Sequence, residues 1–247
     1  MTISSEIVRI KTAIADAYIA SQDMGATMPA VLNSDNLEQC IASISGGGGS
    51  ATVLHKYDRV DGKATVAGFW TDGNGQKYAV CVADAAYRSA EYWSNIDDDT
   101  LLPNYSTQEE ALAAGESATF NMDVIRGNYG LYNYPAFKSV YSKTITLDGV
   151  TYNGVLPNAA ELQMIWNDRA TLDTYDATLT DYPNNSLTTW NIGGNSYSQC
   201  WTSTESINRM AWVLESSGTL NDVVKSNIKV GVIPVIEIPV NENGGVQ

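Results

Sequence analysis

A run of four glycines, Gly46–Gly49, lies between Ser45 and Ser50 and limits how this chain of 247 residues can fold. Glycine restrains the backbone least, so such a run is typical of a linker between units that fold separately. We therefore predict a module at residues 1–45, a linker at 46–50 and one domain at 51–247. The same letters also serve as an engineered linker, so an engineered origin of this stretch is the alternative.

The module at residues 1–45 has a helical pattern. Apolar residues recur at steps of three and four, which places one stripe on a helix; they are Ile3, Ile7, Ile10, Ile14 and Tyr18. A second, shorter helix is predicted around Ile41. Two such helices cannot bury this stripe alone. We therefore expect the module to pack on the next domain, a partner subunit or a larger assembly.

The domain at 51–247 has the pattern of short strands around two helical regions. Hairpin signals are found at Asp61-Gly62, Asp72–Gly75 and Asp148-Gly149. The helical regions are Phe120–Tyr141, which Gly127, Gly130 and Pro135 interrupt, and Asn158–Leu172, which begins with a capping box of Asn158 and Glu161. Strands are expected again at Met210–Leu214, Thr219–Val224 and Lys229–Ile238. Strands, helices and strands in this order predict an α+β fold.

The charge and the apolar pattern exclude several partners. Lys and Arg total 14 against 28 Asp and Glu, a net charge of -14, so we expect neither nucleic acid nor an anionic membrane surface as a partner. No run approaches the ~18 apolar residues of a membrane span, and the N-terminus lacks the apolar stretch of a signal peptide. We therefore expect no membrane insertion, and synthesis in the cytoplasm without a signal peptide.

The residues that could carry catalysis are few. His55 is the one histidine, no nucleophile or phosphate-binding motif is found, and three widely spaced cysteines (Cys40, Cys81 and Cys200) are typical of buried thiols. Asp97–Asp99 fits an acidic surface turn better than a cation site. We predict no catalytic residue, no metal and no cofactor, and hence a protein that is not an enzyme.

Aromatic residues with a polar atom are abundant, with six Trp and 14 Tyr against three Phe. Such rings serve core corners and recognition surfaces alike. We expect Trp166, Trp201 and Trp212 in the core. For the loop tyrosines Tyr129, Tyr132, Tyr134 and Tyr197 both locations stay open.

Three segments together carry a family resemblance. They are GVLPNAAELQMIWNDRATLD at 154–173, WTSTESINRMAW at 201–212 and VGVIPVIEI at 230–238. They resemble the LPxxxEL helix and the last strands of C-type-lectin-like domains of the formylglycine-generating-enzyme branch, over about residues 52–240. This is the scaffold of the variable proteins of diversity-generating retroelements. Phages and gut bacteria encode many of these as receptor-binding proteins.

The resemblance implies a C-type-lectin-like domain, preceded by a module similar to N-terminal segments of phage tail proteins. It implies non-enzymatic binding to a protein or glycan on a bacterial surface, display on a phage tail, virion or cell surface, and a possible homo-oligomer. The module would contact other virion or tail proteins. A formylglycine-generating-type oxidase and a purely structural virion or adhesin domain are the alternatives.

Two departures from that pattern concern the last strands. Ile233-Pro234-Val235 replaces the Arg-Pro-Val that relatives often show, and Gly231 stands where another arginine is common. Interactions made by those arginines are therefore missing here. The oxidase also requires a redox-active cysteine pair late in the domain, where this chain has Cys200 alone.

In the variable proteins, adenine-directed mutagenesis diversifies codons near the C-terminus, and residue types from that alphabet recur here. The resemblance implies a ligand-binding surface made of Ser206, Ile207, Asn208, Arg209, Val213, Thr219, Leu220, Asp222, Val223, Val224, Asn227, Ile228 and Val230, with Glu215 as a neighbour. Trp201, Trp212, Gly218, Lys225 and Pro234 are expected to form the framework. Independently, strand alternation cannot hide Val223, Val224 and Ile228 together, and apolar groups exposed together indicate a partner surface.

Overall fold

The computed structural model describes residues 14–15, 17–18, 52–96, 101–207 and 209–247. The chain divides into two compact units, Met1–Ala51 and Thr52–Gln247. In the first unit, residues 14, 15, 17 and 18 are helical and Tyr18 is buried. The rest of the predicted helical module, its glycine run, Cys40 and the Asp97–Asp99 turn lie outside the described residues.

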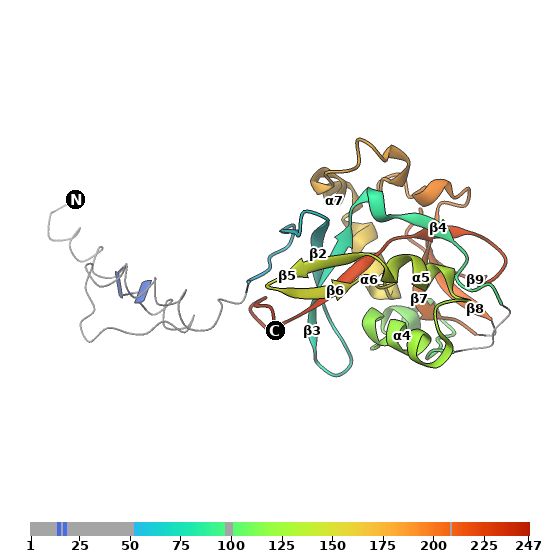
Figure 1. Cartoon of the computed structure of the whole chain (residues 1–247). Helices are drawn as coiled ribbons and strands as arrows, with labels where there is room; N and C mark the ends of the chain where they lie inside the picture. Colours follow the sequence, from blue (N-terminus) through green and yellow to red (C-terminus); the bar gives the residue numbers. More distant parts are fainter. Residues whose placement is uncertain (1–13, 16, 19–51, 97–100, 208) are drawn as a thin grey trace. The chain divides into compact units, whose positions relative to one another are not determined.

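The second unit is α+β, as the sequence predicts, and its described strands form three sheets (Figure 1). The first sheet has the antiparallel order β1-β2-β3-β11, with bounds Arg59–Val60, Ala64–Thr71, Lys77–Ala83 and Val235–Val240. The second has the order β4-β10-β7-β8-β9, with bounds Ser89–Glu91, Val230–Val232, Gln199–Glu205, Met210–Glu215 and Leu220–Val224. In this sheet β10 runs parallel to β7, and the other neighbours are antiparallel. The third is the hairpin β5–β6, Thr144–Leu147 and Val150–Asn153, which turns at Asp148-Gly149 as predicted.

The first helical region is irregular, and its breaks have local causes. The helices of the unit are α3 Gln108–Leu112, α4 Ala118–Val124, α5 Pro135–Tyr141, α6 Ala159–Asn167 and α7 Arg169–Tyr175, with a π-helical turn η2 at Ile125–Tyr129 and short 3-10 turns η1 Ala85–Tyr87, η3 Pro183–Asn185 and η4 Ile192–Gly194. The π turn ends at Gly130, which has a φ of 71°, a conformation that residues other than glycine rarely adopt. Pro135 is the first helical residue of α5, a position where proline is favoured. The interruptions predicted at Gly130 and Pro135 are confirmed, whereas Gly127 lies within the π turn and does not interrupt it.

The second helical region begins with the predicted capping box. The Asn158 side chain accepts the Glu161 N–H at 2.9 Å, and the Glu161 carboxyl accepts the Asn158 N–H at 2.9 Å. The region is two helices, α6 and α7, and not the single predicted one, because Asp168 leaves the helical conformation at φ -117° and ψ 11°.

The first sheet is buried on both faces. Along β3 the alternating residues Ala79 and Cys81 join a cluster under the β5–β6 hairpin, whereas Val80 and Val82 join the larger core under the helices. Burial on both faces explains why apolar residues occupy successive positions along β3. The predicted strand Lys229–Ile238 is broken at Ile233-Pro234, where the chain crosses from the second sheet into the first.

Candidate binding surface

Two loops meet where the second sheet ends. We call residues 206–209, between β7 and β8, and residues 225–229, between β9 and β10, the paired loops. The Ser206 N–H donates to the Met210 carbonyl at 3.0 Å, which closes the first loop, and the Lys225 N–H donates to the Arg209 carbonyl at 3.1 Å, which joins it to the second. Strands β8 and β9 lie at the end of the unit opposite the C-terminus (Figure 1).

A buried ion pair lies at the base of the paired loops. The Lys225 ammonium is 2.8 Å from a Glu205 carboxylate oxygen, both side chains are at most 1% exposed, and the ammonium lies 4.6 Å from the centre of the Trp93 ring. The second Glu205 oxygen accepts the Leu101 N–H at 2.8 Å. Burial raises the pKa of Glu205, and Lys225 partly offsets this rise. These contacts connect both loops to the end of β7 and to the segment after β4.

The predicted framework tryptophans are in the core. Trp201 and Trp212 are 0% and 6% exposed. The Trp201 indole N–H donates to the Glu91 carbonyl at 2.8 Å, which links β7 to the edge strand β4 of the same sheet. The Trp212 indole N–H donates to the Tyr105 carbonyl at 3.1 Å, which joins the second sheet to a segment far away in the sequence. Lys225, expected in the framework, is also buried. Its partners Glu205 and Trp93 were missed, because pairing between distant residues leaves no local sequence signal.

Four residues of the predicted surface are buried, and for them the expectation of an exposed position is wrong. They are Ser206, Val213, Leu220 and Val230, each at most 4% exposed. Val213 and Val230 lie on strands with neighbours on both sides, and Leu220 is part of the larger core. The Ser206 hydroxyl donates to the Asp222 carboxylate at 3.0 Å. None of the four can contact a partner directly.

Five predicted residues gather at the paired loops. Ile207, Arg209 and Asn227 are exposed there, and Val224 and Ile228 are half-buried. Val224 belongs with them because it pairs with Met210, where the first loop returns to β8. Val223 and Ile228 also pack against the core, and Asn208 lies outside the described residues.

Two further predicted residues lie at the other end of the β8–β9 hairpin. Glu215 and Thr219 flank its turn, and β8 separates them from the paired loops by about 17 Å at the usual rise of a strand. Glu215 accepts hydrogen bonds from Gln199 at 2.9 Å and Asn221 at 3.0 Å. The predicted surface therefore divides, and the paired loops are its larger exposed part.

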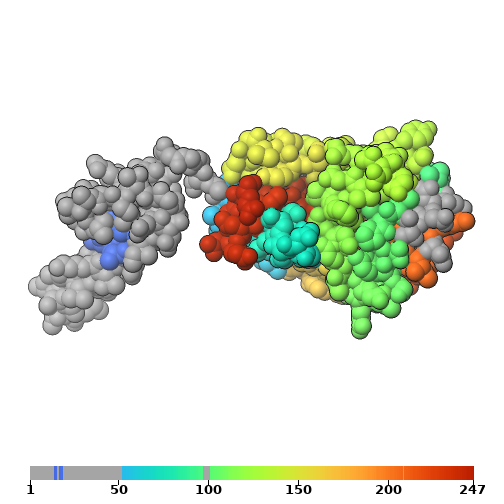
Figure 2. Space-filling model, turned by 90° about the horizontal axis from the view of Figure 1, so that it is seen from below, coloured from blue at the N-terminus to red at the C-terminus, as the bar shows by residue number. Residues whose placement is uncertain are grey.

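The structure assigns locations to the loop tyrosines. Tyr134 is buried against Trp93 and Phe137, whereas Tyr129, Tyr132 and Tyr197 are exposed. The Asn95 N–H donates to the Asn133 carbonyl at 2.8 Å, which joins the loop before α5 to the segment after β4. Figure 2 shows the β7–β8 region (orange) and green residues of the helical region at one end of the unit.

The side chains that could act as catalytic groups, His55 and the cysteines Cys81 and Cys200, lie away from the paired loops or are buried. His55 is exposed, 3.3 Å from the Asp58 carboxylate. Burial raises the pKa of the Cys81 thiol to about 12 and raises that of Cys200 further. Within the described part of the chain, no group of three or more His, Cys, Asp or Glu side chains is placed to hold a metal ion, and no helix is long and apolar enough to cross a bilayer.

No protein-family model matches the sequence, and the curated proteins and solved structures compared with it show no significant match. The geometry of the paired loops and the chemistry of the side chains that they expose are therefore the basis for inferring a function.

Proposed function

We propose that the second unit is a non-enzymatic binding domain with a C-type-lectin-like fold, of the kind that diversity-generating retroelements diversify. The paired loops bind a protein or glycan on a bacterial surface, and the chain is displayed on a phage tail or a similar particle. One observation carries the proposal: exposed side chains of unrelated chemistry project from a base that the buried Lys225–Glu205 pair holds in place.

Two exposed side chains of the paired loops are separable from the fold. Ile207 and Asn227 have aliphatic and amide side chains, and both are exposed. Backbone hydrogen bonds and the buried Lys225–Glu205 pair shape the loops. Side-chain identity at Ile207 and Asn227 can therefore change at little cost to stability, which is the property that a diversified binding site requires.

The oxidase alternative requires a reactive thiol at Cys200. This thiol is 0% exposed, and burial raises its pKa, so the thiolate is disfavoured at neutral pH. A Cβ at Gly231 would lie 2.9 Å from the Cys200 sulfur, so a larger residue there would collide with it. The burial of Cys200 and the raised pKa of its thiol count against the oxidase alternative.

The proposal is tested by replacing Ile207, Arg209, Val224 and Asn227 together with serine. The labelled full-length protein is incubated with a panel of intact bacterial strains, and bound protein is measured by flow cytometry. We expect the wild type to bind at least one strain and the variant to lose at least about tenfold in affinity, because hot-spot side chains carry most binding energy.

The matched control replaces Glu215 with Gln and Thr219 with Ser at the opposite end of the β8–β9 hairpin. This variant should bind like the wild type, and both variants should keep the circular dichroism spectrum of the fold. Unchanged binding by the loop variant, or the absence of binding to every strain, contradicts the proposal. Turnover of a thiol substrate that Cys200→Ser abolishes would support the oxidase instead.

A further inference from the structure

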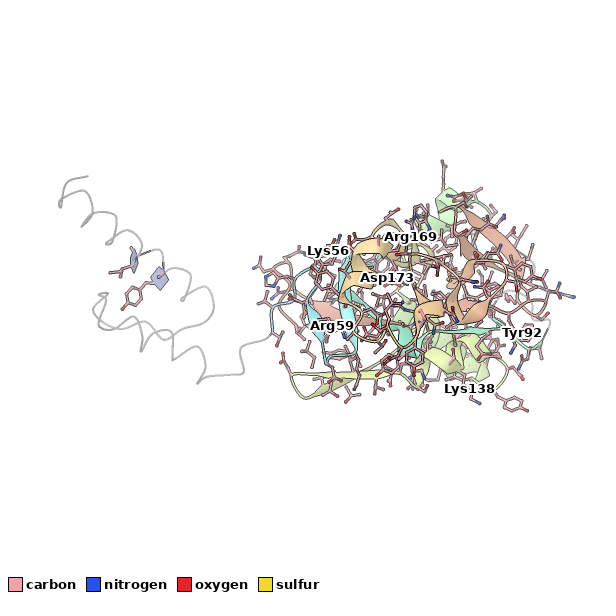
Figure 3. All side chains as sticks on the ribbon, turned by 90° about the horizontal axis from the view of Figure 1, so that it is seen from above. Lys56, Arg59, Tyr92, Lys138, Arg169 and Asp173 are labelled. Atoms are coloured by element: carbon pink, nitrogen blue, oxygen red, sulfur yellow. The ribbon has the colours of Figure 1, made fainter. Side chains whose placement is uncertain are left out.

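A groove of about 460 Å³ lies beside the paired loops. One wall is β4 with Tyr92, a second is the segment 193–197 that ends in Tyr197, and the third is Asn227–Lys229 of the second paired loop. Its volume is within the range of small-ligand sites. In Figure 3, Tyr92 lies at the opposite end of the unit from Lys56 and Arg59.

The wall that carries Tyr197 is held in one conformation. Asn195 is 4% exposed, its side-chain oxygen accepts the Tyr197 N–H at 3.0 Å, and its amide donates to the Gln199 carbonyl at 3.1 Å. Gly193, with φ at 64°, lies so close to β4 that a Cβ there would be 2.4 Å from the Ala90 nitrogen. This wall therefore needs little ordering when a ligand binds.

The groove presents aromatic, amide and ammonium groups. Tyr197 is 58% exposed and Asn227 is also exposed. The Lys229 ammonium lies 5.6 Å from the centre of the Tyr92 ring, an attraction that orients the ammonium at the groove. No acidic residue is among the described residues that line the groove, although the chain has a net charge of -14. Anionic ligands therefore meet less electrostatic repulsion here than on an average surface of this protein, and neutral polar ligands can also bind.

These groups suit a ring that is apolar on its faces and polar at its edge. The C–H groups on one face of a pyranose carry slight positive charge, which is attracted to the negative face of a tyrosine ring such as Tyr197. Hydroxyls at the edge of the sugar can accept from the Lys229 ammonium and exchange hydrogen bonds with the Asn227 amide. A peptide strand fits poorly, because Gly193 packs against the outer edge of β4 where such a strand would add.

We infer that this groove binds a saccharide, with Tyr197 as the stacking surface and Asn227 and Lys229 as the hydrogen-bonding groups. The inference rests on the proposed function, because the groove shares Asn227, Ile228 and Lys229 with the paired loops and specifies their ligand as a glycan. Tyr92, Tyr197 and Lys229 lie outside the predicted variable set. Tyr92 and Tyr197, which lie outside the paired loops, supply the general affinity for sugar, and the paired loops, which include Lys229, select among sugars.

The experiment is a glycan microarray of bacterial surface saccharides, on which each carboxylated glycan is matched to its methyl ester, probed with the full-length protein. We expect binding to a subset of glycans. Tyr197→Ala should weaken it by about tenfold, whereas Tyr197→Phe should keep it within about threefold, because the aromatic face remains. Phe120→Ala is the control, since it removes an aromatic of similar exposure on α4, which does not line this groove.

Lys229→Met separates the two kinds of saccharide. It should weaken binding to carboxylated glycans by about tenfold and binding to their methyl esters by about threefold, because a charged acceptor strengthens the hydrogen bond. Binding to no glycan, or binding that Tyr197→Ala and Lys229→Met leave unchanged, overturns the saccharide inference. The proposed function is tested separately, by the binding of the loop variant to intact cells. If the wild type binds cells, the loop variant does not, and no glycan on the array is bound, the ligand is a protein.

Discussion

At the scale of single residues, two buried carboxyl groups join the first sheet to two helices. Glu237 on β11 accepts the N–H groups of Ala118 at 3.0 Å and Thr119 at 2.6 Å, so its carboxylate stabilises the start of α4. Glu161 on α6 is 0% exposed and faces Glu237. Burial and the neighbouring Glu237 carboxylate raise the pKa of Glu161 well above its ordinary value. Glu161 therefore keeps its proton to a higher pH than an exposed carboxyl group does.

This pair makes stability depend on pH. Folded Glu161 keeps a proton that the unfolded chain releases above about pH 4.3, so its contribution to stability is lost as the pH rises toward the folded pKa. In Glu161→Gln the side-chain oxygen can still accept from the Asn158 N–H, and the amide does not titrate. We expect the free energy of unfolding of the wild type to fall relative to that of the variant by up to about 1.4 kcal/mol per pH unit above about pH 5.

Urea denaturation at several pH values measures the difference. The control is Glu110→Gln, at an exposed carboxylate whose pKa is lowered by hydrogen bonds from Ser106 and which should give the opposite trend, confined to acidic pH. Parallel curves for the wild type and Glu161→Gln would mean that Glu161 is ionised in the folded state.

At the scale of elements, the Lys225–Glu205 pair joins the end of β9 to the end of β7, two strands that β8 separates in the sheet. Most elements here were predictable, because capping boxes and Asp-Gly turns are local signals. The pairing of β10 with β4 and β7 could not be predicted in this way, because it has no local signal. In the case of β4 the paired segments are more than a hundred residues apart in the sequence. Likewise, the burial of Val213 and Leu220 depends on which elements pack over their strands. The alternation of apolar and polar residues along a strand does not indicate this.

Lys225→Met tests what the ion pair contributes to this element. The substitution leaves the Glu205 carboxylate buried without its cation, so we expect a loss of about 3–5 kcal/mol in the free energy of unfolding. Adding Glu205→Leu removes the remaining charge and should restore most of that loss. Chemical denaturation measures both.

Lys63→Met is the matched control, because Lys63 pairs at 2.8 Å with Asp61 on the surface, where solvent screens the attraction, so this substitution should cost much less stability than Lys225→Met. A loss of the same size in Lys225→Met and Lys63→Met would show that the buried pair contributes no more than a surface one.

At the scale of the whole molecule, the second unit contains its own core. Both hydrophobic clusters described for it draw their buried members from Leu54 to Val240. A unit of this size with its own hydrophobic core meets the usual requirement for folding alone. The chain divides into its two compact units at Ala51, next to the glycine run in the sequence.

We therefore expect residues 52–247, expressed without the first unit, to fold with the melting temperature of the full chain. Scanning calorimetry and near-ultraviolet circular dichroism of the two proteins make the comparison. A loss of 1 kcal/mol would lower the melting temperature by about 2–4 °C in a domain of this size, so a drop of that order would show that the first unit contributes to the second.

The sequence by itself determined the α+β class, the hairpin turns, the capped helix at Asn158 and the burial of Trp201 and Trp212, because these follow from local spacing and residue chemistry. The tertiary structure alone decided which predicted surface residues are exposed. It buried Ser206, Val213, Leu220 and Val230, and it brought Tyr92, Tyr197 and Lys229 together around one groove. The physical reason is that exposure and convergence depend on contacts between segments far apart in the chain, which periodicity does not encode.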